Sequence, residues 1–357
     1  MQRRYAVVVG ARPNFVKAAA LFAEAKKHPD VALTLIHTGQ HFDAKMSDIF
    51  FRELKLPAPD LQLEVSGEFH TERIGRMFNA LKHTLAEQKF DAVLVFGDVN
   101  STLAAAIAAA KDGQRLFHIE AGLRSHDRRM PEEINRAVVD HLSDLLFTSE
   151  PSAQINLERE GIPSEQIHYV GNIMAETIEL FRPQIEGSPI LQTLGLSPRS
   201  YGVVTIHRQE NTDDPRQLAQ IFDILREVNK TLPLVVPLHP GTLTRIKTAN
   251  LGAHLEGLRV IEPLGYYDFL KLMMESAGVI TDSGGIQEET SHLGIACATL
   301  RDNTERPITL TLGSNKLFPL ESFQSKEILA HLSRKDFKGG SIPLWGLGVA
   351  QRIFASL

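Results

Sequence analysis

The chain has 357 residues, a formal net charge of −5, 43% hydrophobic residues and 23% charged residues. This composition is typical of a globular protein with more than one core, and the absence of a basic block argues against a nucleic-acid partner. A single cysteine, Cys297, excludes an internal disulfide framework, and no apolar run reaches membrane-spanning length, so no membrane association is expected.

Short β-branched runs alternate with helical patterns in the first half of the chain, and the first run follows the N-terminus without a signal-peptide pattern. The expected location is therefore the cytoplasm. The predicted strands are residues 5–10, 31–38, 92–96, 116–119, 145–148 and 167–170. The predicted helices are residues 15–27, 72–87, 102–111 and 132–142. Strands that alternate with helices predict βαβ units and a parallel sheet covered on both faces.

The second half repeats this scheme. Its predicted strands are residues 202–206, 234–238, 259–261, 279–281 and 296–300, and Cys297 is expected to be buried in the last of them. Between the halves, residues 181–189 and 195–200 are rich in Pro, Gly and Ser, which indicates a hinge region, with the domain boundary somewhere from about 171 to 200. The predicted fold is α/β, with two doubly wound Rossmann-like domains, 1–172 and 173–357, that face each other across a cleft.

Nearly every predicted strand is followed by ionisable or hydroxyl side chains. In a doubly wound sheet the carboxyl ends of the strands line the ligand site, so this pattern favours an enzyme. The most informative stretch is 281–289, in which a strand runs through Gly284 and Gly285 into a helix. Free N–H groups and the helix dipole favour an anion there, and the glycines allow close approach to the backbone.

Glu289, one helical turn after the glycines, suits two sugar hydroxyls better than a phosphate. The turn therefore predicts a nucleoside diphosphate with its ribose on Glu289. The alternative is a simple strand–helix turn capped by Ser283.

Three cations can neutralise a diphosphate: Arg12 and Lys17 flank the start of the first predicted helix, and Arg306 follows a predicted strand. For Arg12 and Lys17 the alternative is a solvated helix start. For Arg306 the alternative is a salt bridge between the domains.

Asp98 and Glu120 end neighbouring strands, and Glu132 opens a helix. Converging carboxylates beside an anionic ligand are unfavourable unless they transfer protons, so these three are candidate acid–base groups. The alternatives are loop capping for Asp98 and Glu120, and a favourable helix-dipole position for Glu132. The adjacent Glu133 is expected to face solvent or to cap.

His207 and His239 follow strands of the second half and are candidates for a general acid or a phosphate partner. The alternative is a structural, hydrogen-bonded histidine. The remaining histidines show no ligand spacing, so no metal site is predicted. Neither a dinucleotide fingerprint nor a Walker A motif is present, so no cofactor is predicted and an ATPase is disfavoured.

Seven motifs occur together in one order, at residues 10–17, 97–102, 118–124, 131–136, 207–211, 281–289 and 301–307. They read GARPNFVK, GDVNST, HIEAGLR, PEEINR, HRQEN, TDSGGIQEE and RDNTERP. In these motifs the chain resembles the non-hydrolysing UDP-N-acetylglucosamine 2-epimerases. The resemblance implies a GT-B type fold, a homodimer, and a last helix, about 349–357, that packs on the first domain.

The resemblance also implies roles for individual residues. Ser283, Gly284 and Gly285 would contact the diphosphate, with Arg12 and His207 near it. Glu289 would bind the ribose, and Phe269 would lie near the base. Asp98, Glu120 and Glu132 match the family's acid–base carboxylates. Some bacterial members bind a second UDP-GlcNAc as an activator, and parts of that site match Gln40, Arg208 and His239.

The implied reaction is reversible conversion of UDP-N-acetylglucosamine to UDP-N-acetylmannosamine, through elimination of UDP to 2-acetamidoglucal and re-addition, as a step of polysaccharide biosynthesis. Asn14 and Asn100 occupy positions that vary among subgroups, so a modified UDP-2-acetamido sugar is an alternative substrate. A GT-B glycosyltransferase and a non-catalytic UDP-sugar sensor are the alternative classes of protein.

Overall fold

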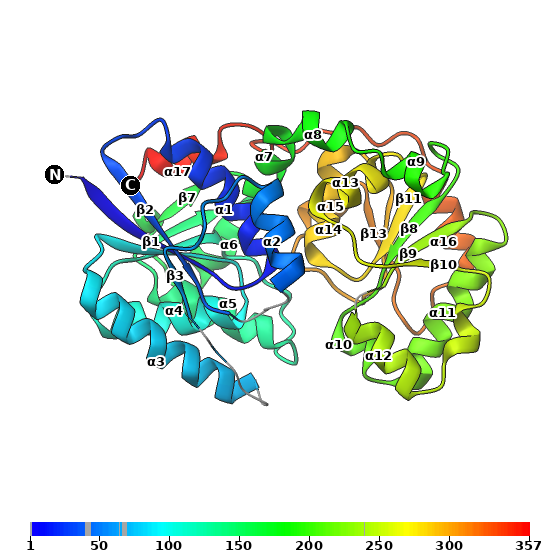
Figure 1. Cartoon of the computed structure of the whole chain (residues 1–357), viewed down its shortest axis with the longest axis horizontal. Helices are drawn as coiled ribbons and strands as arrows, with labels where there is room; N and C mark the ends of the chain where they lie inside the picture. Colours follow the sequence, from blue (N-terminus) through cyan, green and yellow to red (C-terminus); the bar gives the residue numbers. More distant parts are fainter. Residues whose placement is uncertain (1, 40–43, 64, 66–69, 239) are drawn as a thin grey trace. The chain divides into compact units, whose positions relative to one another are not determined.

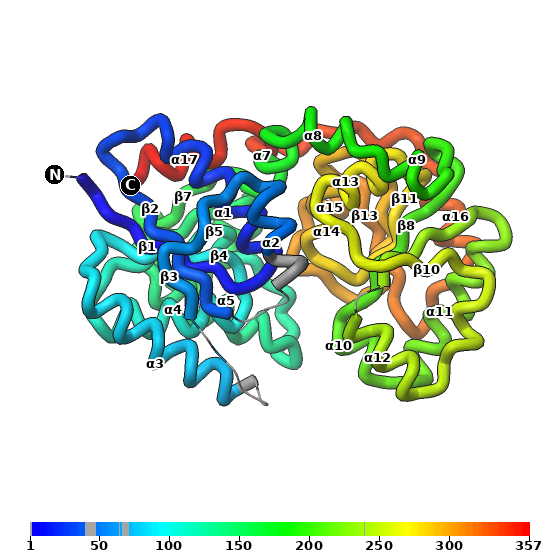
Figure 2. The backbone as a smooth tube through the Cα atoms, viewed as in Figure 1, coloured from blue at the N-terminus to red at the C-terminus, as the bar shows by residue number. Residues whose placement is uncertain are grey.

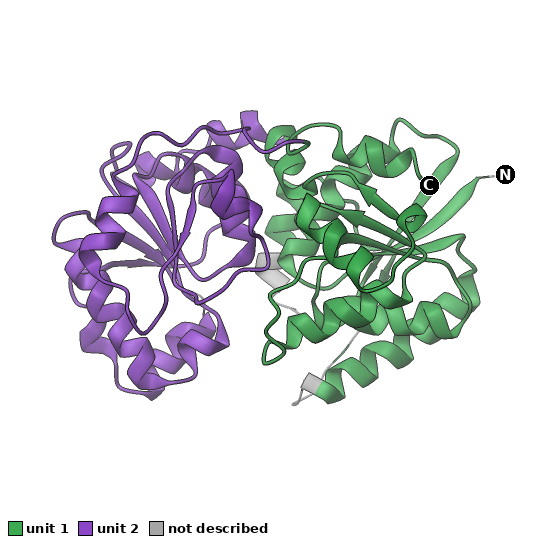
Figure 3. Cartoon of the chain, turned by 180° about the vertical axis from the view of Figure 1, so that it is seen from behind, with its two compact units in different colours: residues 1–180, 344–357 green, residues 181–343 purple. Residues whose placement is uncertain are grey.

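The computed structural model describes residues 2–39, 44–63, 65, 70–238 and 240–357. The chain forms two compact units, shown in Figure 3: unit 1 comprises residues 1–180 and 344–357, and unit 2 comprises residues 181–343. Each unit contains one parallel sheet with helices on both faces, which confirms the predicted α/β class of doubly wound sheets. No helix within the described ranges is long and apolar enough to cross a membrane.

The sheet of unit 1 has seven parallel strands in the order β3-β2-β1-β4-β5-β6-β7. The strands are β1 (Arg3–Val9), β2 (Val31–His37), β3 (Leu61–Gln62), β4 (Ala92–Phe96), β5 (Leu116–Ala121), β6 (Leu145–Thr148) and β7 (Ile167–Tyr169). Strands β4 and β5 are buried along their whole length, as expected for central strands covered on both faces.

The helices of unit 1 lie on both faces of this sheet (Figure 1). They are α1 (Arg12–Ala25), α2 (Ala44–Glu53), α3 (His70–Gln88), α4 (Asn100–Lys111), α5 (Pro131–Leu142), α6 (Pro151–Arg159), α7 (Ile173–Leu180) and α17 (Val349–Phe354), with the 3-10 turn η1 (Ser164–Gln166). Helix α4 contacts α3, α5 and the sheet, and its buried residues include five alanines. These small side chains let α4 approach the strands closely, which fixes the turn between β4 and α4.

The chain returns to unit 1 after unit 2. Figure 2 shows the C-terminal segment beside the first helix, and α17 contacts both α1 and α7. The buried carboxylate of Glu176 accepts hydrogen bonds from the backbone N–H of Gly348 at 2.8 Å and of Ala350 at 2.6 Å. These bonds satisfy donors at the start of α17, whose own N-cap residue is a glycine.

The sheet of unit 2 has six parallel strands in the order β10-β9-β8-β11-β12-β13. The strands are β8 (Gly202–Thr205), β9 (Leu234–Pro237), β10 (Arg259–Ile261), β11 (Gly278–Thr281), β12 (Cys297–Thr299) and β13 (Asn315–Leu317). Cys297 is buried in β12, which confirms its predicted place.

The helices of unit 2 are α8 (Arg182–Glu186), α9 (Ile190–Leu194), α10 (Gln209–Thr212), α11 (Pro215–Asn229), α12 (Pro240–Thr248), α13 (Tyr266–Met274), α14 (Gly284–Leu293), α15 (Ile308–Thr311) and α16 (Ser325–Leu332), with the 3-10 turn η2 (Gly252–Leu255). Helices α11 and α16 share a hydrophobic core with the sheet. The span expected to be a hinge contains α8 and α9, and both of these helices contact α13. Helix α7 instead contacts α1, and the two compact units divide between residues 180 and 181, inside the boundary range of about 171–200 and eight residues after residue 172.

Candidate active site

The candidate acid–base residues of unit 1 lie on neighbouring elements. Asp98 lies two residues after the end of β4, Glu120 is the penultimate residue of the adjacent strand β5, and Glu132 lies in the first turn of α5. The side chains of Asp98 and Glu120 are 20% and 6% exposed, and Glu132 is half-buried. Because β4 and β5 are neighbouring parallel strands, Asp98 and Glu120 lie at the same edge of one sheet, as the sequence predicted.

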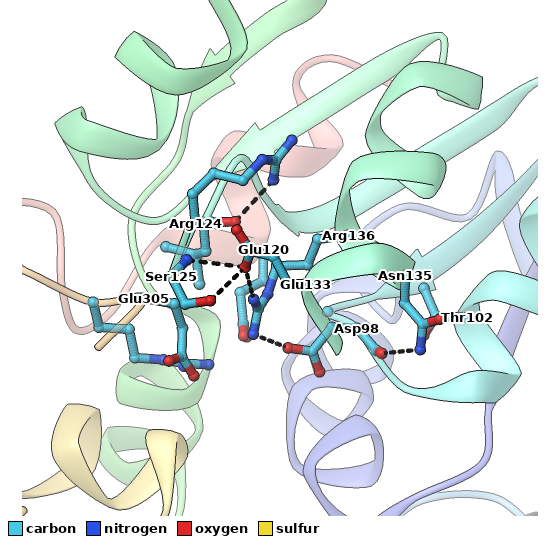
Figure 4. A network of polar contacts seen from close by, with 12 residues as sticks. Asp98, Thr102, Glu120, Arg124, Ser125, Glu133, Asn135, Arg136 and Glu305 are labelled. Atoms are coloured by element: carbon cyan, nitrogen blue, oxygen red, sulfur yellow. Dashed lines mark hydrogen bonds and ion pairs between the residues drawn. The ribbon is translucent and has the colours of Figure 1, made fainter. Parts of the chain in front are cut away.

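A buried arginine fixes the carboxylate of Asp98. Nη2 of Arg136 lies 2.5 Å from Oδ2 of Asp98, and Nη1 of the same side chain lies 2.6 Å from Oε2 of Glu133. Figure 4 shows Arg136 between the two carboxylates. Asn135 donates from Nδ2 to the backbone oxygen of Asp98 at 2.7 Å. The guanidinium fork thus holds one Asp98 oxygen in a defined direction.

Glu133 does not face solvent, so that part of the expectation was wrong. Its carboxylate is buried and accepts hydrogen bonds of 2.9 Å from the backbone N–H groups of Ser125 and His126 and from the Ser125 hydroxyl. It therefore caps the loop before α5, which was the other part of the expectation, and it orients Arg136, a role that the sequence pattern did not reveal.

Lys17 is placed differently from a solvated helix residue. Its side chain is 5% exposed, and its Nζ forms an ion pair with the carboxylate of Glu120. Gly97 leaves room for this pair, because a Cβ at that position would lie 3.1 Å from Nζ. Lys17 thus balances the buried charge of Glu120.

The backbone at Glu120 is unusual. Its φ of 68° lies in the left-handed region, and the register between β5 and β6 shifts between Ile119 and Ala121. A left-handed conformation costs a residue with a side chain roughly 1–2 kcal/mol, and such strain concentrates at functional sites. The shift makes Glu120 an interruption of an otherwise regular strand.

Arg12 is the first residue of α1 and is half-buried, with Pro13 in the first turn as expected. Its guanidinium carbon Cζ lies 5.6 Å from the centroid of the Phe50 ring. This distance is within the range of a cation–π contact, which orients the guanidinium.

In unit 2, the glycine turn joins β11 to α14 as predicted. Ser283 is the N-cap residue of α14, but its side chain makes no capping hydrogen bond, so the explanation as a serine cap was wrong. Gly284 has a packing reason, because a Cβ there would lie 2.4 Å from Nη1 of Arg306. Gly285 follows it in the first turn and is half-buried.

Arg306 forms ion pairs within unit 2. Its Nε lies 3.0 Å from Oε2 of Glu288, and its Nη1 contacts the carboxylate of Glu305. Arg301 also reaches Glu305, with Nη2 3.0 Å from Oε2. The cation expected beside the glycine turn is therefore present and is oriented by two buried carboxylates.

Glu289 is 8% exposed in the second turn of α14. Burial, followed by the charge of Glu288, raises its pKa from 4.5 to about 8. A neutral carboxyl can donate one hydrogen bond and accept others, which fits a pair of hydroxyl groups.

His207 lies after β8, and its side chain is 46% exposed. Its Nδ1 lies 3.2 Å from Oδ1 of Asp282, which is fully buried and also accepts from the backbone N–H of His207 at 3.0 Å and of Arg208 at 2.9 Å. A carboxylate at Nδ1 fixes the ring tautomer and directs Nε2 outward. Sequence reasoning missed Asp282, although an acid directly after a strand was the available signal.

The other predicted site residues are less constrained. Phe269 is half-buried on α13, and Nη2 of Arg208 lies 3.5 Å from Oε1 of Glu305. Gln40 and His239 lie outside the described residues. Within the described ranges, no group of three His, Cys, Asp or Glu side chains is placed to hold a metal ion.

Known proteins match this chain over most of its length. The family model described as UDP-N-acetylglucosamine 2-epimerase matches residues 23–353. The chain is 43% identical to UDP-2,3-diacetamido-2,3-dideoxy-D-glucuronate 2-epimerase of Pseudomonas aeruginosa, over 87% of this chain and 86% of the relative. It is 39% identical to a UDP-N-acetylglucosamine 2-epimerase of Methanococcus maripaludis, over 87% and 86%.

The fold agrees with the sequence matches. The crystal structure of Methanocaldococcus jannaschii UDP-GlcNAc 2-epimerase in complex with UDP-GlcNAc and UDP superimposes with a TM-score of 0.91, covers 99% of each chain and is 34% identical. The chain therefore belongs to the family of UDP-N-acetylglucosamine 2-epimerases, which makes it an isomerase.

Proposed function

We propose that the enzyme interconverts UDP-N-acetylglucosamine and UDP-N-acetylmannosamine by eliminating UDP and adding it back. The observation that carries this proposal is the pair of carboxylates at adjacent strand ends, Asp98 and Glu120, each held by its own buried cation. Proton transfer at C2 from two faces needs an acid–base group for each face or a sugar that turns between the steps, and a pair of carboxylates fits the first route. In this proposal, residues of unit 1 transfer the protons and residues of unit 2 bind the uridine diphosphate.

The C2 hydrogen of the sugar is not acidic, because no carbonyl group is adjacent to C2. It can leave as a proton when the C1–O bond to UDP breaks at the same time. One carboxylate takes the proton, and the C–H electron pair forms the C1=C2 double bond of 2-acetamidoglucal while UDP departs with the C1–O pair. In the second step of the reaction, a proton is added to the other face of C2 and UDP attacks C1.

The residues around the glycine turn suit the departing diphosphate. The N–H groups of Gly284 and Gly285 lie at the N-terminus of α14, where the helix dipole favours an anion. His207, with its ring oriented by Asp282, and Arg12 are proposed to add charge and hydrogen bonds to the same group. Arg306 and Lys17 act mainly through the carboxylates that they pair with.

Glu289 is proposed to bind the ribose hydroxyls and Phe269 to contact the base. Glu132, for which no ion pair is seen among the described residues, is the third candidate for proton transfer. We do not assign which of the three carboxylates transfers the proton at each face of C2.

The test is proton NMR of UDP-GlcNAc with the enzyme in heavy water. The expected result is UDP-ManNAc with deuterium at C2 in both sugars. Asp98→Asn and Glu120→Gln should each lower turnover by roughly 10²–10⁴-fold, the range of a general acid or base, while UDP still binds. Retention of the C2 hydrogen in the product would refute elimination.

A second candidate substrate is UDP-2,3-diacetamido-2,3-dideoxy-D-glucuronate, because the relative from Pseudomonas aeruginosa acts on it by name and is 43% identical. The same assay with both UDP-sugars decides between them through their ratio of kcat/KM. A glycosyltransferase would leave UDP-GlcNAc unchanged without an acceptor.

We also propose a homodimer and activation by a second UDP-GlcNAc, with Arg208 as the described part of the activator site. Sedimentation velocity tests the first proposal. The second predicts that UDP-ManNAc alone reacts slowly until UDP-GlcNAc is added, and that Arg208→Ala weakens this activation. The cytoplasmic location and the role in polysaccharide biosynthesis stay predictions.

A further inference from the structure

A fully buried histidine lies two residues before Glu120 on β5 and has no part in the chemistry proposed above. The side chains of His118 and its partner Asp140 on α5 are both 0% exposed. Nδ1 of His118 lies 2.7 Å from Oδ1 of Asp140, and Nε2 lies 2.8 Å from the backbone oxygen of Gly97. One ring therefore links β4, β5 and α5.

The two ends of this link lie beside the candidate carboxylates. Gly97, which accepts from His118, immediately precedes Asp98 and has a left-handed φ of 57°. The other oxygen of Asp140 accepts from the backbone N–H of Gly122 at 3.1 Å, two residues after Glu120. Gly122 is also left-handed, with φ of 78°, and a Cβ there would lie 2.4 Å from the backbone oxygen of Ala153.

Asp140 is itself anchored. Nη1 of Arg124 lies 2.7 Å from its Oδ2, and Nη2 of the same arginine lies 2.7 Å from Oε2 of Glu160. Burial alone would raise the pKa of Asp140, but the charges and hydrogen bonds of His118 and Arg124 outweigh it and the pKa lies below its ordinary value. The carboxylate thus accepts from three sides and cannot rotate without losing a bond.

A fully buried histidine is usually a packing residue with its polar atoms satisfied, and such a role predicts only a loss of stability. Here the pair hydrogen-bonds to Gly97, beside Asp98, and to Gly122, two residues after Glu120, so its loss would act on the backbone next to both carboxylates. Arg136 pairs with Asp98 and Glu133, and Lys17 pairs with Glu120.

We propose that His118 and Asp140 are positioning residues that set the separation of Asp98 and Glu120 by tying the Gly97 turn to the Gly122 turn. The inference rests on the proposed function, because the two carboxylates matter together only if protons are exchanged on two faces of one carbon. Displacing reacting groups by about 1 Å can cost on the order of 10²-fold in rate.

The main variant is His118→Leu, which removes both hydrogen bonds. Its matched control is Phe117→Leu, the adjacent residue of β5, which is 1% exposed and packs against Tyr5 and Phe147. Relative to this control, His118→Leu is expected to lower kcat by about 10²-fold, with KM and the Kd for UDP changed less than about threefold. Should His118→Leu not fold, His118→Gln can serve only one acceptor at a time and is expected to lose about tenfold in kcat with the same unchanged KM.

The variant Asp140→Asn tests whether the hydrogen bonds of Asp140 or its negative charge matters. An asparagine oxygen can still accept from Gly122 and Arg124, and its amide can donate to Nδ1 of a neutral His118 whose Nε2 still donates to Gly97. All bonds survive without the negative charge, so kcat is expected to stay within about tenfold of wild type if position is what matters.

Amide hydrogen exchange gives a readout that does not depend on activity. In His118→Leu or His118→Gln, the Gly122 amide and the amides of residues 97–100 should exchange faster than in Phe117→Leu. The proposal is overturned if kcat and exchange match those of the control, if KM rises in parallel with the fall in kcat, or if Asp140→Asn loses as much activity as His118→Leu. If wild type shows no epimerase activity, the proposed function fails, and the exchange data alone decide whether the pair ties the two turns.

Discussion

The buried carboxyl of Glu289 makes the stability of unit 2 depend on pH. Burial and Glu288 raise its pKa from 4.5 to about 8 in the folded chain. The folded state therefore keeps the proton up to about pH 8, whereas the unfolded chain releases it above about pH 4.5. The contribution of Glu289 to the free energy of unfolding is therefore full below about pH 4.5 and is lost progressively as the pH rises toward about 8.

The size of this loss follows from the width of the window. Each pH unit between the two pKa values is worth about 1.4 kcal/mol, so Glu289 lowers the free energy of unfolding by up to about 5 kcal/mol at pH 8. Glu289→Gln keeps the shape of the neutral carboxyl and removes its titration. The variant should therefore match wild type near pH 4.5 and become the more stable protein as pH rises.

Differential scanning calorimetry without nucleotide, from about pH 5 to about pH 8.5, measures this effect. At pH 8 the Tm of Glu289→Gln should exceed that of wild type by on the order of 10 °C, given about 2–4 °C per kcal/mol for a domain of this size. Glu262→Gln removes an exposed charge from the same unit and should show no such trend. A Tm difference between Glu289→Gln and wild type that stays constant over this pH range would refute the reasoning.

Arg136→Met should destabilise the protein by about 3–5 kcal/mol in urea unfolding, because it leaves two paired carboxylates without their buried cation; a loss below about 1 kcal/mol would contradict this. Gly284→Ala should cost about 1–3 kcal/mol, since the new Cβ would lie 2.4 Å from the Arg306 guanidinium. Gly75→Ala, in an exposed turn of α3 with no atom within 4 Å of the new Cβ, should instead gain roughly 0.5–1 kcal/mol in the same assay. Glu176→Ala removes the acceptor for two backbone donors at the start of α17, so limited proteolysis should release the C-terminal segment faster than in wild type.

The strands of the two sheets could be predicted because their signal is local. Buried parallel strands need short apolar runs, and each of the predicted runs became a strand with boundaries shifted by only a residue or two. Two edge strands, β3 and β13, were not predicted. β13 reads Asn315-Lys316-Leu317, and an edge strand with polar residues has no apolar run and is defined only by pairing with its neighbour.

The sequence predicted where the candidate residues lie in the fold, but it did not predict which side chains pair with them. The rule that strand ends carry the chemistry identified Asp98, Glu120 and His207 from the sequence. Their partners, such as Lys17 for Glu120, come from elements far away in the chain, and only the packing of those elements brings them together. The left-handed backbone of Glu120 likewise has no signal in a residue type that ordinarily avoids it.

Unit 2 is one continuous segment of the chain, whereas unit 1 is made of two segments that flank it. During synthesis, unit 2 can complete its fold once residue 343 has left the ribosome, but unit 1 lacks α17 until residues 344–357 follow. Nascent chains should therefore hold unit 1 in an unfinished state, with Glu176 lacking the backbone donors that it meets in the finished protein. Translation order thus makes the domain that begins first the one that is completed last.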